Sequence, residues 1–145
     1  MRLDYQALFA EDFATITTAD TYESTNAYDL DGTTSPPNFG PGETVKVLIQ
    51  VTEAFATGTQ ITFNLISATD AALTGTPTVQ ATTGAILTAA LTLGKQFILT
   101  VPVVAIAQRY LGLNMVSTGT YDAGKFTAGI VGDVQTADSG FPAVL

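Results

Sequence analysis

The sequence lacks the side chains on which most catalytic and metal sites depend. None of its 145 residues is Cys or His. Without cysteine there can be no disulfide, thiolate zinc site, iron–sulfur cluster or cysteine nucleophile. Without histidine the chain has neither the commonest general base nor the commonest metal ligand. We therefore expect neither an enzyme nor a bound cofactor or metal.

Basic residues are also scarce. Five Lys and Arg residues face thirteen Asp and Glu residues, which gives a formal net charge of −8 at pH 7. The five are scattered along the chain: Arg2, Lys46, Lys95, Arg109 and Lys125. Binding to a phosphate backbone or to an anionic membrane needs clustered basic residues. We therefore expect neither nucleic acid nor a membrane as a partner.

Long hydrophobic runs are missing as well. The longest apolar-rich stretch, residues 97–107, is too short to span a bilayer and contains Pro102. Near the N-terminus, Asp4, Glu11 and Asp12 stand where a signal peptide would need an apolar core. These features predict synthesis in the cytoplasm without a targeting segment.

The surface is expected to be poor in charge. Charged residues make up only 12% of the chain and the mean hydropathy is +0.32, whereas about a quarter of an average chain is charged. A single domain with so few charges is expected to bury part of its surface against a partner or another copy. The alternative is a Thr- and Ala-rich surface that is merely uncharged.

Much of the sequence alternates between apolar and more polar residues, as β-strands do. In residues 44–55, Val45, Val47, Ile49 and Val51 alternate with more polar positions. Similar patterns predict further strands at 26–30, 60–67, 76–82, 95–103, 109–117 and 125–135. Residues 82–94 fit no period cleanly, and we interpret them as extended. The pattern favours an all-β antiparallel jelly-roll sandwich of about eight strands over an immunoglobulin-like one.

The N-terminal third differs from the rest. Residues 1–53 contain nine of the thirteen acidic residues: Asp4, Glu11, Asp12, Asp20, Glu23, Asp29, Asp31, Glu43 and Glu53. The spacing of apolar residues over 4–16 favours one helix. Residues 31–43 are rich in Pro and Gly and predict a loop. We interpret residues 1–25 as an irregular acidic N-terminal arm and residues 26–145 as one jelly-roll domain.

Three short motifs imitate functional sites. Residues 117–126 contain most of a phosphate-binding P-loop, but Phe126 replaces the required Ser or Thr and the flanks predict strands, so a hairpin turn is favoured. Residues 138–140 read Asp-Ser-Gly, as in aspartic proteases, but lack a second copy, and we interpret them as a C-terminal turn. Residues 29–32 match only the start of a calcium loop and favour a solvated turn.

Two stretches carry a family resemblance. Residues 108–135, which include Arg109 to Asn114 and Thr127 to Val131, and the upstream residues 47–55 resemble the cement, or decoration, proteins of short-tailed phages such as the Bordetella phage. The resemblance covers about residues 26 to 135. It implies a jelly roll that sits outside a capsid and clamps neighbouring major capsid subunits non-covalently. It also implies a homo-oligomer on the virion surface, a two-fold dimer first and a trimer second.

Candidate contact residues follow from this expectation. Leu8, Phe9, Phe13 and Phe39 are apolar anchors of the acidic N-terminal part, while Arg109 and Tyr110 belong to residue types enriched in interface hot spots. For Tyr110, cover of a sheet edge is the equal alternative. The competing functions are a carbohydrate-binding jelly-roll module or surface adhesin and, third, a small hydrolase.

Overall fold

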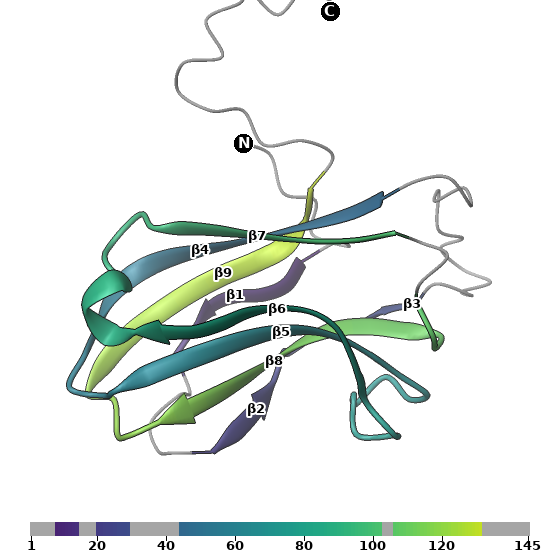
Figure 1. Cartoon of the computed structure of the whole chain (residues 1–145), viewed down its shortest axis with the longest axis horizontal. Helices are drawn as coiled ribbons and strands as arrows, with labels where there is room; N and C mark the ends of the chain where they lie inside the picture. Colours follow the sequence, from purple (N-terminus) through teal and green to yellow (C-terminus); the bar gives the residue numbers. More distant parts are fainter. Residues whose placement is uncertain (1–7, 15–19, 30–43, 103–105, 132–145) are drawn as a thin grey trace, which may run out of the picture.

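This computed structural model describes residues 8–14, 20–29, 44–102 and 106–131. The strands of this part form two antiparallel sheets that pack as a sandwich (Figure 1). The elements are β1 (Leu8–Phe13), β2 (Thr21–Glu23), β3 (Tyr28–Asp29), β4 (Thr44–Ala56), β5 (Gln60–Ala68), β6 (Thr78–Leu87), the 3₁₀ helix η2 (Thr88–Ala90), β7 (Gln96–Pro102), β8 (Tyr110–Thr118) and β9 (Ala123–Val131). One sheet has the order β1-β9-β4-β7 and the other β2-β8-β5-β6, with β3 also on β8.

The order of pairing is that of a jelly roll. Both β2 and β3 pair with β8, so they act as one interrupted strand. The strands then pair from the outside inward along the chain: β1 with β9, β2 and β3 with β8, β4 with β7, and β5 with β6. Two further pairings, β4 with β9 and β5 with β8, complete the sheets. The predicted antiparallel jelly-roll sandwich is confirmed.

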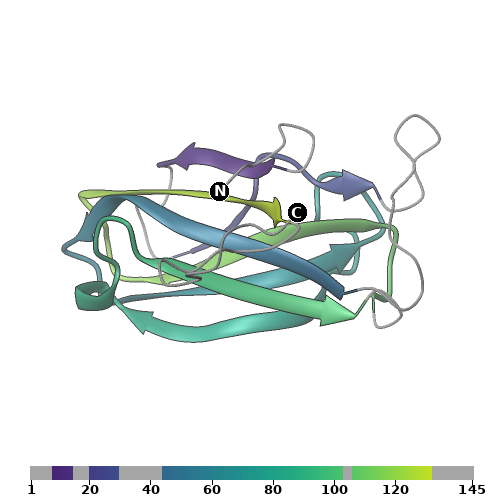
Figure 2. The same cartoon turned by 90° about the horizontal axis from the view of Figure 1, so that it is seen from above.

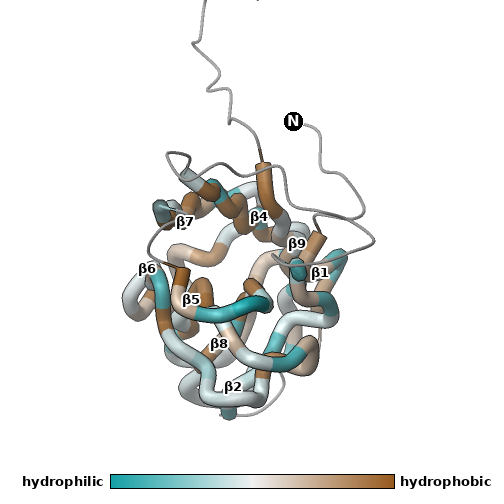
Figure 3. The backbone as a smooth tube through the Cα atoms, turned by 90° about the vertical axis from the view of Figure 1, so that its right-hand side faces the viewer, coloured by the Kyte–Doolittle hydropathy of each residue, from teal (hydrophilic) through white to brown (hydrophobic). Residues whose placement is uncertain are grey.

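The core lies between the two layers, which Figure 3 views with β7, β4, β9 and β1 in one layer and β6, β5, β8 and β2 in the other. The alternating residues of β4 that the sequence placed on one face are fully buried, as are those of β5. Phe63 of β5 lies at the centre, with its ring centroid 5.1 Å from that of Phe126 and 6.3 Å from that of Phe97. Burial of one such ring contributes about 1.5–3 kcal/mol.

The N-terminal segment corrects two expectations. Its described residues 8–13 form a strand and not the helix predicted over 4–16, because β1 pairs with β9 in the first sheet. The register of β1 shifts twice, and Asp12 has a φ of 45°. Such irregularity spaces the inward-facing residues unevenly, which imitates a helical period. Since β2 also lies in the second sheet, the described part of residues 1–25 belongs to the sandwich and is not an irregular arm.

The region around residues 76–94 is a strand that ends in a helical turn. The two stretches that the sequence separated, 76–82 and 82–94, contain the single strand β6, followed by η2 at one end of the sandwich (Figure 2). The extended interpretation is therefore confirmed up to Leu87 and wrong at Thr88–Ala90. Gly84, with a φ of 70°, and two register shifts against β5 explain why the period was unclear. Among the described residues, no helix has the length and hydrophobicity to cross a bilayer.

Candidate contact surfaces

The motif at residues 117–126 is a turn, as predicted, but not a hairpin, because β8 and β9 lie in different sheets. It joins β8 directly to β9, so no helix follows that could face a phosphate. Gly119 has a φ of 89° and Gly124 a φ of 136°. A Cβ at Gly124 would lie 2.2 Å from Cδ1 of Phe55, so the ring of Phe55 occupies the space that any other side chain would need. The glycines serve the turn and its packing, and not a nucleotide.

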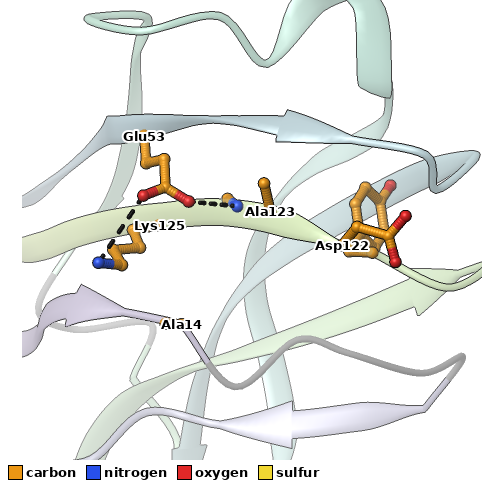
Figure 4. A pocket seen from close by; sticks show the side chains of 7 residues that line it. Ala14, Glu53, Asp122, Ala123 and Lys125 are labelled. Atoms are coloured by element: carbon orange, nitrogen blue, oxygen red, sulfur yellow. Dashed lines mark hydrogen bonds and ion pairs between the residues drawn. The ribbon is translucent and has the colours of Figure 1, made fainter.

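A shallow pocket lies beside this turn (Figure 4). Its lining residues are Ala14, Glu53, Tyr121, Asp122, Ala123, Gly124 and Lys125. Nζ of Lys125 lies 3.7 Å from Oε2 of Glu53, and the backbone N–H of Gly124 donates to Oε1 at 3.0 Å. Both charged side chains are almost half exposed. Glu53 is thus an exposed and paired carboxylate that ties the turn to β4, and the described residues contain no group of three or more potential metal ligands.

One side of the sandwich, formed by β1 and β2 with the residue before β2, carries exposed carboxylates, and we call it the acidic edge. Its exposed acids are Glu11, Asp12, Asp20 and Glu23. Thr52 donates a hydrogen bond of 2.8 Å to Oδ1 of Asp12, so that carboxylate is held against β4. No basic residue lies within β1 or β2. This edge therefore presents negative charge to any partner.

The predicted apolar anchors do not lie on the outside of this edge. Phe9 is only 1% exposed and belongs to the core, so its expected role as a contact residue is wrong for the folded chain. Phe13 is half-buried, and its ring centroid lies 5.3 Å from that of Phe126. Leu8 is half-buried and pairs with Gly129 of β9. Phe39 lies outside the described residues.

Arg109 and Tyr110, the other two predicted contact residues, are brought together with Asp29. Nε and Nη2 of Arg109 each donate a hydrogen bond of 2.8 Å to a different carboxylate oxygen of Asp29. The guanidinium carbon lies 5.1 Å from the centroid of the Tyr110 ring. This bidentate and stacked geometry holds Arg109 in one orientation although it is exposed. The cluster ties β3 to β8, and Asp29 of the calcium-like motif is used in this pair.

Gly112, next to this cluster on β8, is required by packing. A Cβ at Gly112 would lie 2.3 Å from Cδ1 of Leu73. Leu73 is 1% exposed and packs with Ile66 and Ala68, with Tyr110 partly covering them. The loop between β5 and β6 therefore folds back over the outer face of the second sheet and places Leu73 against the glycine.

The opposite side of the sandwich, residues 78–102 with β6, η2 and β7, is what we call the apolar edge. The large hydrophobic residues exposed on it are Val79, Leu87, Leu93 and Ile98, with exposed fractions of 55%, 61%, 71% and 48%. Elsewhere in the described part only Val116 is a large exposed hydrophobic residue, at 39%. The sequence did carry a signal for this surface that residue-by-residue motif searching missed. Lys95 is the only charged residue between Asp70 and Arg109.

The chain is similar to a known protein family. The family model described as Bbp16 matches residues 10–130 of the chain, from within β1 to within β9. The match thus includes all four exposed acids of the acidic edge, the Arg109 cluster and the whole apolar edge. No curated protein matches the chain.

Proposed function

The chain belongs to the Bbp16 family, a family of Bordetella phage proteins, and from that premise we propose that it is a structural virion protein that binds the outside of the phage capsid. In this role it stabilises the shell by clamping neighbouring major capsid subunits without covalent bonds. The observation that carries the proposal is the family match, because it spans nearly the whole sandwich. The step from phage protein to capsid cement rests on the resemblance of residues 47–55 and 108–135 to cement proteins.

The charge distribution supports a binding role on a shell. The acidic edge exposes four carboxylates without a basic residue within its strands. Such an edge would attract a basic surface, speed the encounter and fix the orientation of docking. Each contact can be weak, because a symmetric oligomer that grips two subunits gains from the high effective concentration of its second grip. We favour a homodimer for this purpose, with a trimer as second choice.

Arg109 and Tyr110 remain candidates for a second contact. Asp29 and the Tyr110 ring hold the guanidinium in place before any partner arrives. An ordered Arg loses less conformational entropy on binding than a freely rotating one, which favours it as an interface residue. The fold offers no comparable reason to propose catalysis, and we propose a function without enzymatic activity, cofactor, nucleic acid or membrane.

The carbohydrate-binding alternative has weaker support. Sugar-binding sites on β-sandwiches commonly offer an exposed aromatic ring for stacking. No aromatic residue is exposed in the described part, and Phe13, Tyr22, Tyr28 and Phe97 pack against the core. Binding of the isolated protein to a glycan array would favour that alternative over the capsid role.

The test of the proposed function uses phage shells that lack this protein. The purified protein is added to such shells, and co-sedimentation and the temperature of shell disruption are measured. We expect saturable binding and a higher disruption temperature for decorated shells. Absence of binding, or equal heat resistance of decorated and bare shells, would contradict the cement role.

The contribution of the acidic edge can be measured in the same assay. Glu11→Gln with Glu23→Gln removes two exposed charges for which the structure gives no hydrogen bond, so the fold should be unchanged. We expect weaker binding to shells and a smaller loss of binding at high salt than for the unmodified protein. Asp122→Asn, at the turn between β8 and β9, removes a carboxylate outside the acidic edge and serves as the control. An equal loss per removed charge in the two variants would show that net charge, and not this edge, governs binding.

A further inference from the structure

We propose that the apolar edge is the surface through which two copies of this chain pair, with β7 of one copy lying antiparallel to β7 of the other. A two-fold axis allows this arrangement, because it brings the same patch of both copies together. The proposal rests on the proposed function in one respect: it names the surface that would join two clamping copies. It rests otherwise on the backbone, side chains and charges of the edge.

The backbone of β7 is an open and regular edge. Its pairing with β4 runs from Gln96 opposite Gln50 to Pro102 opposite Thr44 without a register shift. In the order of its sheet, β7 is terminal, and no strand of the described residues lies on its other side. Unpaired N–H and C=O groups of a regular edge strand invite pairing with another strand. The neighbouring edge strand β6 is interrupted by two register shifts and by Gly84 with a φ of 70°, and bulges of this kind discourage pairing.

The side chains along this edge lack the usual protection against association. Proteins commonly protect an edge strand with Lys, with Pro inside the strand or with inward-pointing charges. Here Pro102 stands only at the end of β7, and the side-chain nitrogen of Lys95 lies 5.8 Å from the centroid of the Phe97 ring. Ile98 is exposed at the middle of β7, opposite the fully buried Leu48. A second copy would cover Ile98 and Leu93 and extend the same apolar row.

The distribution of charge favours a second copy as the partner. Two chains of net charge −8 repel each other wherever their acids meet. All acidic residues of the described part lie outside residues 71–108. Pairing through the apolar edge therefore keeps the acidic edges at the far ends of the dimer. A basic surface, by contrast, would gain more from the acidic edge than from this one.

Light scattering and sedimentation of the full-length protein over a range of concentrations test the proposal. We expect a dimer whose dissociation constant changes little with salt, since the contact is uncharged. Ile98→Lys places a charge in the contact twice, once from each copy, and should raise the dissociation constant by roughly tenfold or more. Leu93→Lys is the second variant, in case Ile98→Lys disturbs folding. Val116→Lys introduces the same charge at a comparably exposed position of β8, away from this edge, and should leave the dimer intact.

Each result decides the proposal. A dimer that is weakened by Ile98→Lys or Leu93→Lys with unchanged melting, and not by Val116→Lys, supports it. A monomeric unmodified protein, a dimer that persists in both edge variants, or equal weakening by Val116→Lys overturns it. If the unmodified protein is monomeric and the edge variants instead lose binding to shells, the edge belongs to the shell contact. A dimer that passes these tests but does not bind shells leaves this inference standing while the proposed function fails.

Discussion

The acidic edge and the apolar edge stand at opposite ends of the strand orders, and they use their hydrophobic residues in opposite directions. On the acidic edge Phe9 is buried and Phe13 packs on Phe126, so that the side chains left outside are carboxylates. On the apolar edge Leu93 and Ile98 point outward and almost no charge accompanies them. The difference teaches that the hydrophobic residues of a charged segment can be used for the core alone. Those of a segment with almost no charge can remain on the surface, where they are available for contact with another molecule.

The largest expected effect contrasts a buried and an exposed position on the two edges. Phe9→Asp should destabilise the fold by more than about 3 kcal/mol, because it removes a core ring and buries an unpaired carboxylate. Leu93→Asp should change the stability of the monomer by no more than about 0.5 kcal/mol, since the side chain is exposed. Urea unfolding of both variants measures the difference. Similar stabilities would show that the two edges have been assigned wrongly. Deletion of residues 1–25 should also unfold the protein, because it removes β1, β2 and the core residue Phe9.

A smaller effect is expected where the loop before the apolar edge is anchored. Gly112→Val would force its side chain into the space of Leu73, and such overpacking costs typically about 1–3 kcal/mol. Thermal unfolding should show a lower melting temperature. Leu73→Ala combined with Gly112→Val should recover part of the loss, because the smaller side chain vacates the space. No recovery would indicate that Leu73 does not pack on this glycine.

A weaker effect is expected at the ion pair that ties β3 to β8. Arg109→Ala should lower the free energy of unfolding by less than about 1 kcal/mol, since the pair is partly exposed and screened by water. Arg109→Lys keeps the charge but not the bidentate geometry, and should behave more like Arg109→Ala than like the unmodified protein. Denaturant melts at low salt provide the measurement. A loss of several kcal/mol would mean that the pair organises much more of the sheet than its exposure indicates.

The smallest expected effect is a change of folding stability with pH that depends on Asp70, the last charged residue before the apolar edge. The backbone N–H of Gly75, the hydroxyl of Thr74 and the backbone N–H of Thr74 all donate to its carboxylate. These hydrogen bonds lower the pKa of Asp70 below its usual value of 3.8. Because the folded pKa is the lower one, the stabilisation is present above pH 3.8 and is lost as the pH falls through the folded pKa.

An NMR titration of the Asp70 carboxyl group measures this directly. We expect its midpoint below 3.8, and a melting temperature that falls less steeply with acid in Asp70→Asn than in the unmodified protein. Asp122→Asn provides a comparison at an exposed turn. A midpoint at or above the usual value would contradict the hydrogen-bonded loop that precedes the apolar edge.

Much of the fold could be predicted from the sequence because its central strands are regular. In β4 and β5, period-two alternation identified the inward faces correctly, and the glycines of residues 117–126 predicted the turn. The method failed where the strands are irregular. The shifts in β1 and β6 break the two-residue period, so β1 was predicted as a helix and β6 was divided.

The candidate contact surfaces were predicted less well, for a different physical reason. Motif searching looks for residues that are present, such as Phe9 or Arg109, and it cannot tell an inward side chain from an outward one without the strand register. Arg109 and Tyr110 do lie in contact, whereas Phe9 is buried in the core. The apolar edge has no motif, since its signature is the lack of charge between Asp70 and Arg109 apart from Lys95.

A cryo-electron microscopy map of the phage shell with this protein bound tests the central claim most directly. The account predicts sandwich-shaped density on the outer surface, in contact with more than one major capsid subunit. It predicts that the acidic edge faces the shell and that the apolar edges of two copies face each other. Density inside the shell, no density at all, or a sandwich that touches a single subunit would contradict the account.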